Sequence, residues 1–209
     1  MGYLELLTLT EGQKYQIIYA DPPWTYPNWN LRQKLQGDFL GISSQKDRSP
    51  SRHYPTMTID DIRNLPISQL TDTHCVLFLW VLPNMLKEGI ATLESWGFTY
   101  KTIAFTWVKK NKKKDSWFWG MGGWTRSNAE LCLLGIKGQP KRIAKNIHSI
   151  IETPIDTHSK KPSEVRDKIV LLCGDVPRIE LFARTQALGW DAWGNETDKF
   201  SEGHPRGFF

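Results

Sequence analysis

The sequence predicts an α/β fold with a mostly parallel β-sheet and helices on both faces. Apolar runs of strand length recur along the chain, and segments with apolar residues at helical spacing lie between several of them. Strands that alternate with helices are typical of parallel sheets. The chain has 209 residues, the size of one ordinary α/β domain. We therefore expect a single domain over residues 1–209.

The expected strands are short apolar runs, several of them rich in β-branched residues. They cover residues 15–20, 75–80, 102–108, 129–136, 178–184 and 191–193. The run at 75–80 is apolar without interruption, which indicates a central strand buried on both faces.

Three helices are expected, at residues 58–65, 84–96 and 162–173. The first begins at Thr58, a capping residue with an acid three positions later, and ends before Pro66. The second has apolar residues at helical spacing and is closed by Gly97. The third has Gly174 just past its end.

Three segments show no regular pattern. Residues 28–52 form a long polar insertion, and loops of this length are commonly lids or binding loops. Residues 109–127 form a basic and aromatic connection between two expected strands, and residues 197–209 resemble a loose tail.

Composition indicates a soluble protein with no membrane role. Hydrophobic residues make up 40% of the chain, and no apolar stretch approaches the roughly 20 residues that cross a bilayer. The first residues lack the pattern of a signal peptide. Cys75, Cys132 and Cys173 are far apart and have apolar neighbours, so we expect reduced cysteines and no metal site. The expected location is the cytoplasm.

The most informative motif is Asp21-Pro22-Pro23-Trp24, directly after the strand expected at 15–20. Open α/β sheets bind ligands at the carboxyl ends of their strands. Each proline lacks a backbone N–H but keeps its C=O, so the motif offers acceptors suited to an amine donor. A nucleobase carries such an amine, and Trp24 would stack on the base. Alternatively, Asp-Pro-Pro is only a turn and Trp24 a core residue; the preceding strand and the companion motifs favour the site.

The net charge of +5 is concentrated in one segment. Five lysines occur within six residues, and tryptophans follow at once, a combination that suits backbone contact and base stacking. A solvated loop is the alternative. The residues expected to contact nucleic acid are Lys109, Lys110, Lys112, Lys113, Lys114, Trp119 and Arg126.

Two further positions suggest ligand contacts. Lys161 directly precedes Pro162 at a helix start, where the backbone N–H groups and the lysine together would bind a carboxylate or phosphate; otherwise Lys161 points into water. Glu180 interrupts an apolar strand. It either forms an ion pair with Arg178 or Arg184, or it joins Arg184 at the polar groups of a ligand.

Together these motifs resemble the DPPW-type adenine N(6)-methyltransferases, the MT-A family, over almost all of residues 15–196. The pieces that carry the resemblance are ADPPW at 20–24, YPTM at 54–57, VLFLW at 76–80, ELCLLGIKG at 130–138, SKKP at 159–162, RIELFAR at 178–184 and WGNE at 193–196.

The resemblance implies methyl transfer from S-adenosylmethionine to the adenine amine. It implies a Rossmann-like class I methyltransferase fold with seven strands and a permuted motif order. Asp21 and Pro22 would hold the amine within the catalytic motif at 21–24, and Trp24, Tyr54 and Trp80 would contact the base. The cofactor would meet Asp21, Lys161, Glu180, Arg184, Asn195 and Glu196, with Lys161 at its carboxylate.

DNA is favoured over RNA as the substrate, because the chain resembles compact DNA-modifying members of the family. Three alternatives stay open: the same reaction on RNA, a catalytically silent nucleic-acid-binding subunit, and cytosine N(4)-methylation, whose sites typically carry Ser-Pro-Pro instead. The sequence does not determine the oligomeric state, which is either monomer or homodimer.

Overall fold

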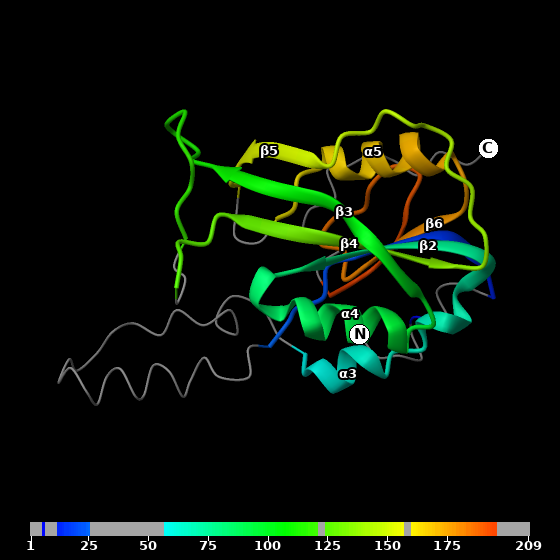
Figure 1. Cartoon of the computed structure of the whole chain (residues 1–209). Coiled ribbons are helices and arrows are strands. Elements are labelled where there is room, and N and C mark those ends of the chain that lie inside the picture. Colours follow the sequence, from blue (N-terminus) through cyan, green and yellow to red (C-terminus); the bar gives the residue numbers. More distant parts are fainter. Residues whose placement is uncertain (1–5, 7–11, 26–56, 121–123, 157–159, 196–209) are drawn as a thin grey trace.

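The computed structural model describes residues 6, 12–25, 57–120, 124–156 and 160–195. Its centre is a seven-stranded sheet (Figure 1) with the strand order β5-β3-β4-β2-β1-β6-β7. The strands are β1 (Tyr15–Ala20), β2 (Thr71–Val81), β3 (Thr99–Lys110), β4 (Ala129–Lys137), β5 (Ile150–Pro154), β6 (Arg178–Leu181) and β7 (Asp191–Trp193).

The sheet is mixed, so the prediction of a mostly parallel sheet is corrected. β1 pairs in parallel with β2 and β6, β3 with β5, and β6 with β7. β4 is antiparallel to both of its neighbours, β2 and β3. The described part of the connection from β3 to β4, residues 111–128, contains no helix. Strands joined without a crossover helix can lie antiparallel, which is why β4 reverses direction.

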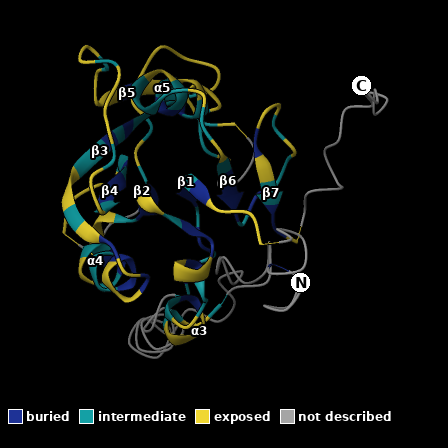
Figure 2. Cartoon of the chain, turned by 90° about the vertical axis from the view of Figure 1, so that its right-hand side faces the viewer, coloured by how far each residue is buried: buried dark blue, intermediate teal, exposed yellow. Residues whose placement is uncertain are grey.

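Helices cover both faces of the sheet, as predicted (Figures 1 and 2). α3 (Ile59–Arg63) and α4 (Leu86–Ser95) lie over one face, and α5 (Glu164–Cys173) lies over the other. Ile18 of β1 belongs to the core on the α4 side, whereas Tyr19 belongs to the core on the α5 side. Because successive side chains of a strand point to opposite faces, β1 contributes to both cores.

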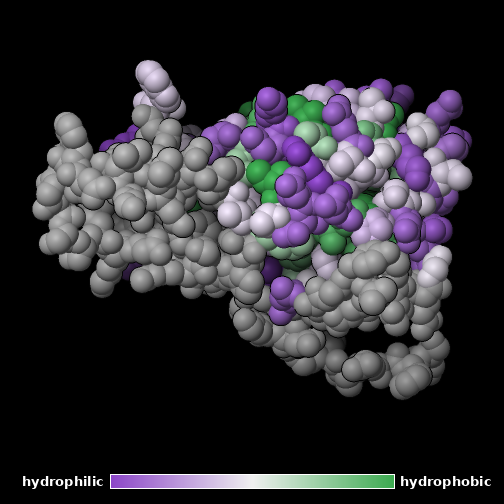
Figure 3. Space-filling view, turned by 90° about the horizontal axis from the view of Figure 1, so that it is seen from below, coloured by the Kyte–Doolittle hydropathy of each residue, from purple (hydrophilic) through white to green (hydrophobic). Residues whose placement is uncertain are grey.

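The helices α3 and α4 are amphipathic. Ile62 and Leu93 are fully buried against the sheet, while Asp60, Lys87 and Glu94 face solvent. Figure 3, which views the molecule from this side, shows a described surface that is mostly hydrophilic with small hydrophobic areas. This distribution is the one expected of helices that cover a sheet.

Most predicted elements are confirmed with shifted ends. β1 has the predicted bounds, and α3 begins after Thr58, whose Oγ1 accepts a hydrogen bond from the Asp61 backbone N–H at 3.1 Å. The strand predicted over 178–184 ends at Leu181, because Phe182 adopts a φ of 60°, outside the extended region. β5 was not predicted. It has five residues at the sheet edge, with only Ile151 buried, too short a pattern to recognise.

Among the described residues, no helix combines the length and apolar character that membrane crossing requires. The same residues contain no cluster of three His, Cys, Asp or Glu side chains that could bind a metal ion. Cys75 and Cys132 are buried free thiols, and Cys173 is a half-buried free thiol.

Candidate active site

The carboxyl ends of β1, β2, β3 and β6 meet at one edge of the sheet, together with the amino end of β4. Asp21 directly follows β1, whose last residue pairs with β2 and β6. Trp80 lies near the end of β2, Lys109 near the end of β3, and Glu130 is the second residue of β4. The reversed direction of β4 is what brings Glu130 to this edge.

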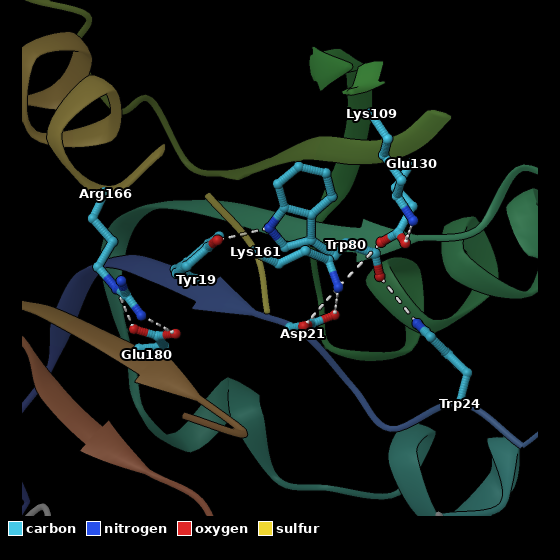
Figure 4. Close-up of polar contacts among 9 residues, drawn as sticks. All are labelled: Tyr19, Asp21, Trp24, Trp80, Lys109, Glu130, Lys161, Arg166 and Glu180. Carbon is cyan, nitrogen blue, oxygen red and sulfur yellow. Dashed lines mark hydrogen bonds and ion pairs between the residues drawn. The ribbon is translucent and has the colours of Figure 1, made fainter. Parts of the chain in front are cut away.

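Four side chains at this edge form a chain of alternating charges (Figure 4), which we call the charge chain: Asp21, Lys161, Glu130 and Lys109. The Lys161 Nζ donates to both carboxylate oxygens of Asp21, each at 2.7 Å. The same Nζ lies 3.1 Å from Oε2 of Glu130, and Lys109 donates to Oε1 of Glu130. Two negative and two positive charges therefore balance one another in a largely buried setting.

The charge chain shifts the pKa values of its members. Burial raises the pKa of Asp21 above its usual value of 3.8, although the adjacent Lys161 opposes this shift. Burial alone would lower the pKa of Lys161, but Asp21 and Glu130 raise it on balance. Lys161 is therefore a stable cation, and Asp21 is ionised chiefly because this cation is beside it.

Glu130 behaves in the opposite sense to Asp21. Burial alone would raise the pKa of Glu130, but the ammonium groups of Lys161 and Lys109 outweigh burial and lower it below 4.5. A carboxylate between two cations stays ionised in conditions where Asp21 begins to bind a proton. Glu130 is thus a fixed negative charge beside Lys161.

Aromatic side chains surround the charge chain. Trp80 is 1% exposed, and its ring lies 5.5 Å from the Lys161 Nζ, within range of a cation–π contact. The Trp80 Nε1 donates to the hydroxyl of Tyr19 at 2.7 Å, and the Trp24 Nε1 donates to the backbone oxygen of Trp80 at 3.0 Å. Trp24 is 5% exposed and belongs to the core on the α4 side. Its base-stacking role, like that of Trp80, stays a prediction.

The two prolines of the motif are held by backbone hydrogen bonds. Pro22 is buried, and its oxygen accepts from the Trp24 N–H at 2.8 Å, while the Pro23 oxygen accepts from the Met57 N–H at 3.0 Å. A carbonyl has two lone pairs, so the Pro22 oxygen retains one for a further donor. Tyr54, predicted to contact the base, lies outside the described residues.

Glu180 is paired with an arginine that the sequence did not suggest. The Arg166 Nε and Nη2 on α5 donate to its two carboxylate oxygens at 2.6 and 2.9 Å. Arg178, one of the two partners predicted for Glu180, instead pairs with Asp175. Burial raises the pKa of Glu180 and Arg166 opposes the rise.

The last predicted cofactor residues come together where β6 and β7 end. The Ala183 N–H donates to the Trp193 backbone oxygen at 2.9 Å. A Cβ at Gly194 would lie 2.1 Å from the Ala183 oxygen, so only glycine fits this close approach. Arg184 lies near enough to Asp21 to favour its ionised form. Asn195 lies on the surface beside Gly194, and Glu196 lies outside the described residues.

Two buried polar atoms on the two edge strands, the Trp193 Nε1 on β7 and the Thr153 Oγ1 on β5, lack a hydrogen-bond partner among the described residues. Buried polar groups are normally paired, so such atoms indicate positions where a ligand or water would bind. Thr153 and Lys161 also line a hollow of about 200 Å³ beside the charge chain. A bound molecule therefore has access to the Lys161 side of the site.

The lysine segment is not one uniform patch. Lys109 is part of the charge chain, Lys110 pairs with Asp115 and Glu152, and Lys112 pairs with Asp156. The predicted contacts that face solvent without a described ion pair are Lys113, Lys114, Trp119 and Arg126. Contact of these residues with nucleic acid stays a prediction.

Sequence reasoning missed Glu130 and Arg166 as members of the site. Glu130 lies in an otherwise apolar run of β4, which is the same signal that drew attention to Glu180. Arg166 carries no comparable signal, because a basic residue on a helix usually faces water.

Comparison with known proteins agrees with the resemblance seen in the sequence. The family model MT-A70 matches residues 15–196. The Type II methyltransferase M.MunI of Mycoplasma sp is 36% identical over 194 residues, covering 88% of this chain and 78% of that protein.

Two longer relatives match the same region. A putative N(6)-adenosine-methyltransferase MT-A70-like protein of Medicago truncatula is 32% identical, covering 88% of this chain and 26% of that protein. The human N(6)-adenosine-methyltransferase catalytic subunit METTL3 is 29% identical, covering 88% of this chain and 28% of that protein. The chain thus spans most of M.MunI but less than a third of these two relatives.

Proposed function

The chain belongs to the MT-A70 family, and we propose that it transfers the methyl group of S-adenosylmethionine to the exocyclic N6 amine of adenine in DNA. The observation that carries this proposal is the Asp21 carboxylate, which receives two hydrogen bonds from one nitrogen at the carboxyl edge of β1. The Asp21 oxygens accept from an N–H donor in this position, so they are also suited to accept from the adenine amine.

The chemistry requires these acceptors. The lone pair of the adenine amine is delocalised into the ring, so the amine is a poor nucleophile. Asp21 and the free lone pair of the Pro22 carbonyl would accept the two amine hydrogens and direct the lone pair toward the electrophile. The N–C bond would form as the S–CH₃ bond of the sulfonium breaks, which leaves S-adenosylhomocysteine, and Asp21 or water would take the proton that the amine loses.

S-adenosylmethionine supplies the methyl group as a sulfonium. Lys161 is the cation suited to its carboxylate, and Glu180, Arg184 and Asn195 are suited to its polar groups, with Glu196 beside them in sequence. Lys161 and Glu180 are both paired in the structure, so cofactor binding would require them to share or exchange partners.

DNA is favoured over RNA because the match covers 78% of the Type II methyltransferase M.MunI, compared with 26% and 28% of the two N(6)-adenosine-methyltransferases. Similarity to those two proteins makes RNA the second candidate. We further propose that the sheet is a Rossmann-like class I methyltransferase fold with permuted motif order, since Asp21 of the catalytic motif precedes Glu180 of the cofactor strand.

The test is to incubate the purified protein with methyl-labelled S-adenosylmethionine and matched pools of DNA and RNA, and then to identify the methylated nucleoside by mass spectrometry. The expected product is N6-methyladenine in DNA. Label only in RNA would support the second candidate. Absence of label in both pools would reject catalysis, and absence of cofactor binding as well would point to a silent subunit.

A further inference from the structure

Lys109 differs from the lysines that follow it. Its side chain is 19% exposed, compared with 64% for Lys112, and its ammonium group lies over the ring of Trp107 at 4.9 Å. Its backbone N–H donates to Asn128 at 3.2 Å, which fixes the residue at the end of β3. The Lys109 ammonium therefore points toward the charge chain rather than toward solvent.

Glu130 distributes its charge between two lysines, one at each oxygen. Lys109 donates to Oε1, and the Lys161 Nζ lies 3.1 Å from Oε2. The Glu130 side chain is only 11% exposed, so water competes weakly for these oxygens and the local interactions are strong. Lys109 occupies one of the two Glu130 oxygens, so Glu130 attracts Lys161 less strongly than it would without Lys109. The Lys161 ammonium is therefore able to donate to both carboxylate oxygens of Asp21.

We propose that Lys109 is a positioning residue that acts through Glu130: it occupies one Glu130 oxygen and so keeps Lys161 at the Asp21 carboxylate, and it does not contact the nucleic-acid backbone. This inference rests on the proposed methyl transfer, because it concerns the same carboxylate. It also replaces the earlier assignment of Lys109 to the nucleic-acid surface.

The inference has a direct physical consequence for substrate binding. When the adenine amine replaces Lys161 as the donor to one Asp21 oxygen, the Lys161 cation still needs a negative charge nearby. Glu130 provides that charge. If Lys109 is neutralised, both oxygens of Glu130 become available to Lys161 and draw it away from Asp21. Asp21 is then a buried acid without its cation and binds a proton more readily, which removes an acceptor for the amine.

The experiment compares Lys109→Met with Lys113→Met in methyl-transfer kinetics and in oligonucleotide binding across a salt series. For Lys109→Met we expect kcat to fall about tenfold, equivalent to about 1.4 kcal/mol, with KM for DNA within about twofold of the parent. The slope of log affinity against log salt should not change. For Lys113→Met the slope should become less negative by about one, as expected when one phosphate contact is lost.

A double variant separates indirect from direct action. Because Lys109 acts through Glu130, Lys109→Met combined with Glu130→Gln should lose no more kcat than Glu130→Gln alone. Lys109→Arg retains a cation opposite Glu130 and should recover most of the activity. Lys101→Met removes an exposed lysine near the amino end of β3, at the opposite edge of the sheet from the charge chain, and controls for the change in net charge.

Two results would overturn the inference. One is a Lys109→Met variant with unchanged kcat, a raised KM for DNA and a slope of log affinity against log salt that is less negative by about one. That result would make Lys109 a phosphate contact. The other is a double variant whose fold-loss in kcat equals the product of the fold-losses of the two single variants. In both cases the parent protein still transfers methyl groups, so the proposed function stands. A parent that neither binds nucleic acid nor transfers a methyl group rejects the proposed function itself, and the inference with it.

Discussion

The guanidinium group of Arg166 donates two hydrogen bonds to the carboxylate of Glu180, at 2.6 and 2.9 Å. The bond pair joins α5 to β6 and is largely shielded from water, since the two side chains are 18% and 9% exposed. Paired, planar bonds of this type fix orientation as well as distance. Arg166 therefore determines how Glu180 is presented at the predicted cofactor edge.

Replacing Arg166 with Met should lower the free energy of unfolding by about 3–5 kcal/mol near neutral pH, because an unpaired buried carboxylate remains. Burial already raises the pKa of Glu180 above 4.5, and loss of Arg166 would raise it further. Protonation of the folded variant then relieves the penalty, so the loss should be smaller near pH 5 than near pH 8. Urea unfolding at both pH values measures this difference.

The matched control is Lys168→Met, which removes a cation from the same helix without touching Glu180. Its unfolding free energy should change by less than about 1 kcal/mol. A loss in Arg166→Met that is equal at both pH values would mean that the energy comes from packing of the arginine stem and not from the ion pair.

Much of the fold could be predicted from the sequence because its strong signals are local. The apolar runs of β1, β2 and β4 and the capping pattern of Thr58 each specify an element without reference to the rest of the chain. The direction of β4 depends on how its long connection folds, which no local pattern encodes. β5 has a single fully buried residue and takes its place by pairing with β3.

The candidate site shows the same division. Asp21 and Lys161 carry sequence signals, and the structure brings them together although 140 residues separate them. Glu130 and Arg166 take their roles only from tertiary neighbours, and Lys109 was grouped by sequence with lysines that it does not join in space. The lysines of the run are neighbours in sequence, but successive residues of a strand point to opposite faces of the sheet. Neighbouring lysines can therefore lie in different surroundings.

Asp21→Ala should reduce methyl transfer by at least about 10³-fold, because it removes the main acceptor for the amine and the counter-charge of Lys161. The fold should persist, since Glu130 still neutralises Lys161. Binding of S-adenosylhomocysteine, measured by calorimetry, should be largely preserved. Equal turnover in the variant and the parent would remove Asp21 from the mechanism.

The acid limb of the pH profile should lie above the usual aspartate range. Burial raises the pKa of Asp21 above 3.8, with Lys161 and Arg184 opposing and Glu130 adding to the rise. Asp21 accepts amine hydrogens only when ionised, so kcat should fall as pH drops through this raised pKa.

The variant Glu130→Gln tests the cause of that limb. Removing the Glu130 charge lowers the pKa of Asp21, because a nearby like charge no longer disfavours ionisation. The remaining activity should therefore persist to lower pH than in the parent. Tyr19 and Cys132 beside Asp21 stay neutral in this pH range, because burial raises the pKa of each. An acid limb that moves to higher pH, or stays in place, would contradict the assignment to Asp21.

Salt dependence of DNA binding measures how much of the basic segment contacts phosphate. Lys113, Lys114 and Arg126 face solvent, whereas Lys110 and Lys112 already pair with acids. Each neutralised phosphate contributes about −0.9 to the slope of log affinity against log salt, so three contacts predict a slope of about −3. Replacing Lys113, Lys114 and Arg126 together with Met should bring the slope close to zero. An unchanged slope in that triple variant would assign the segment to solvent and require another surface to bind the nucleic acid.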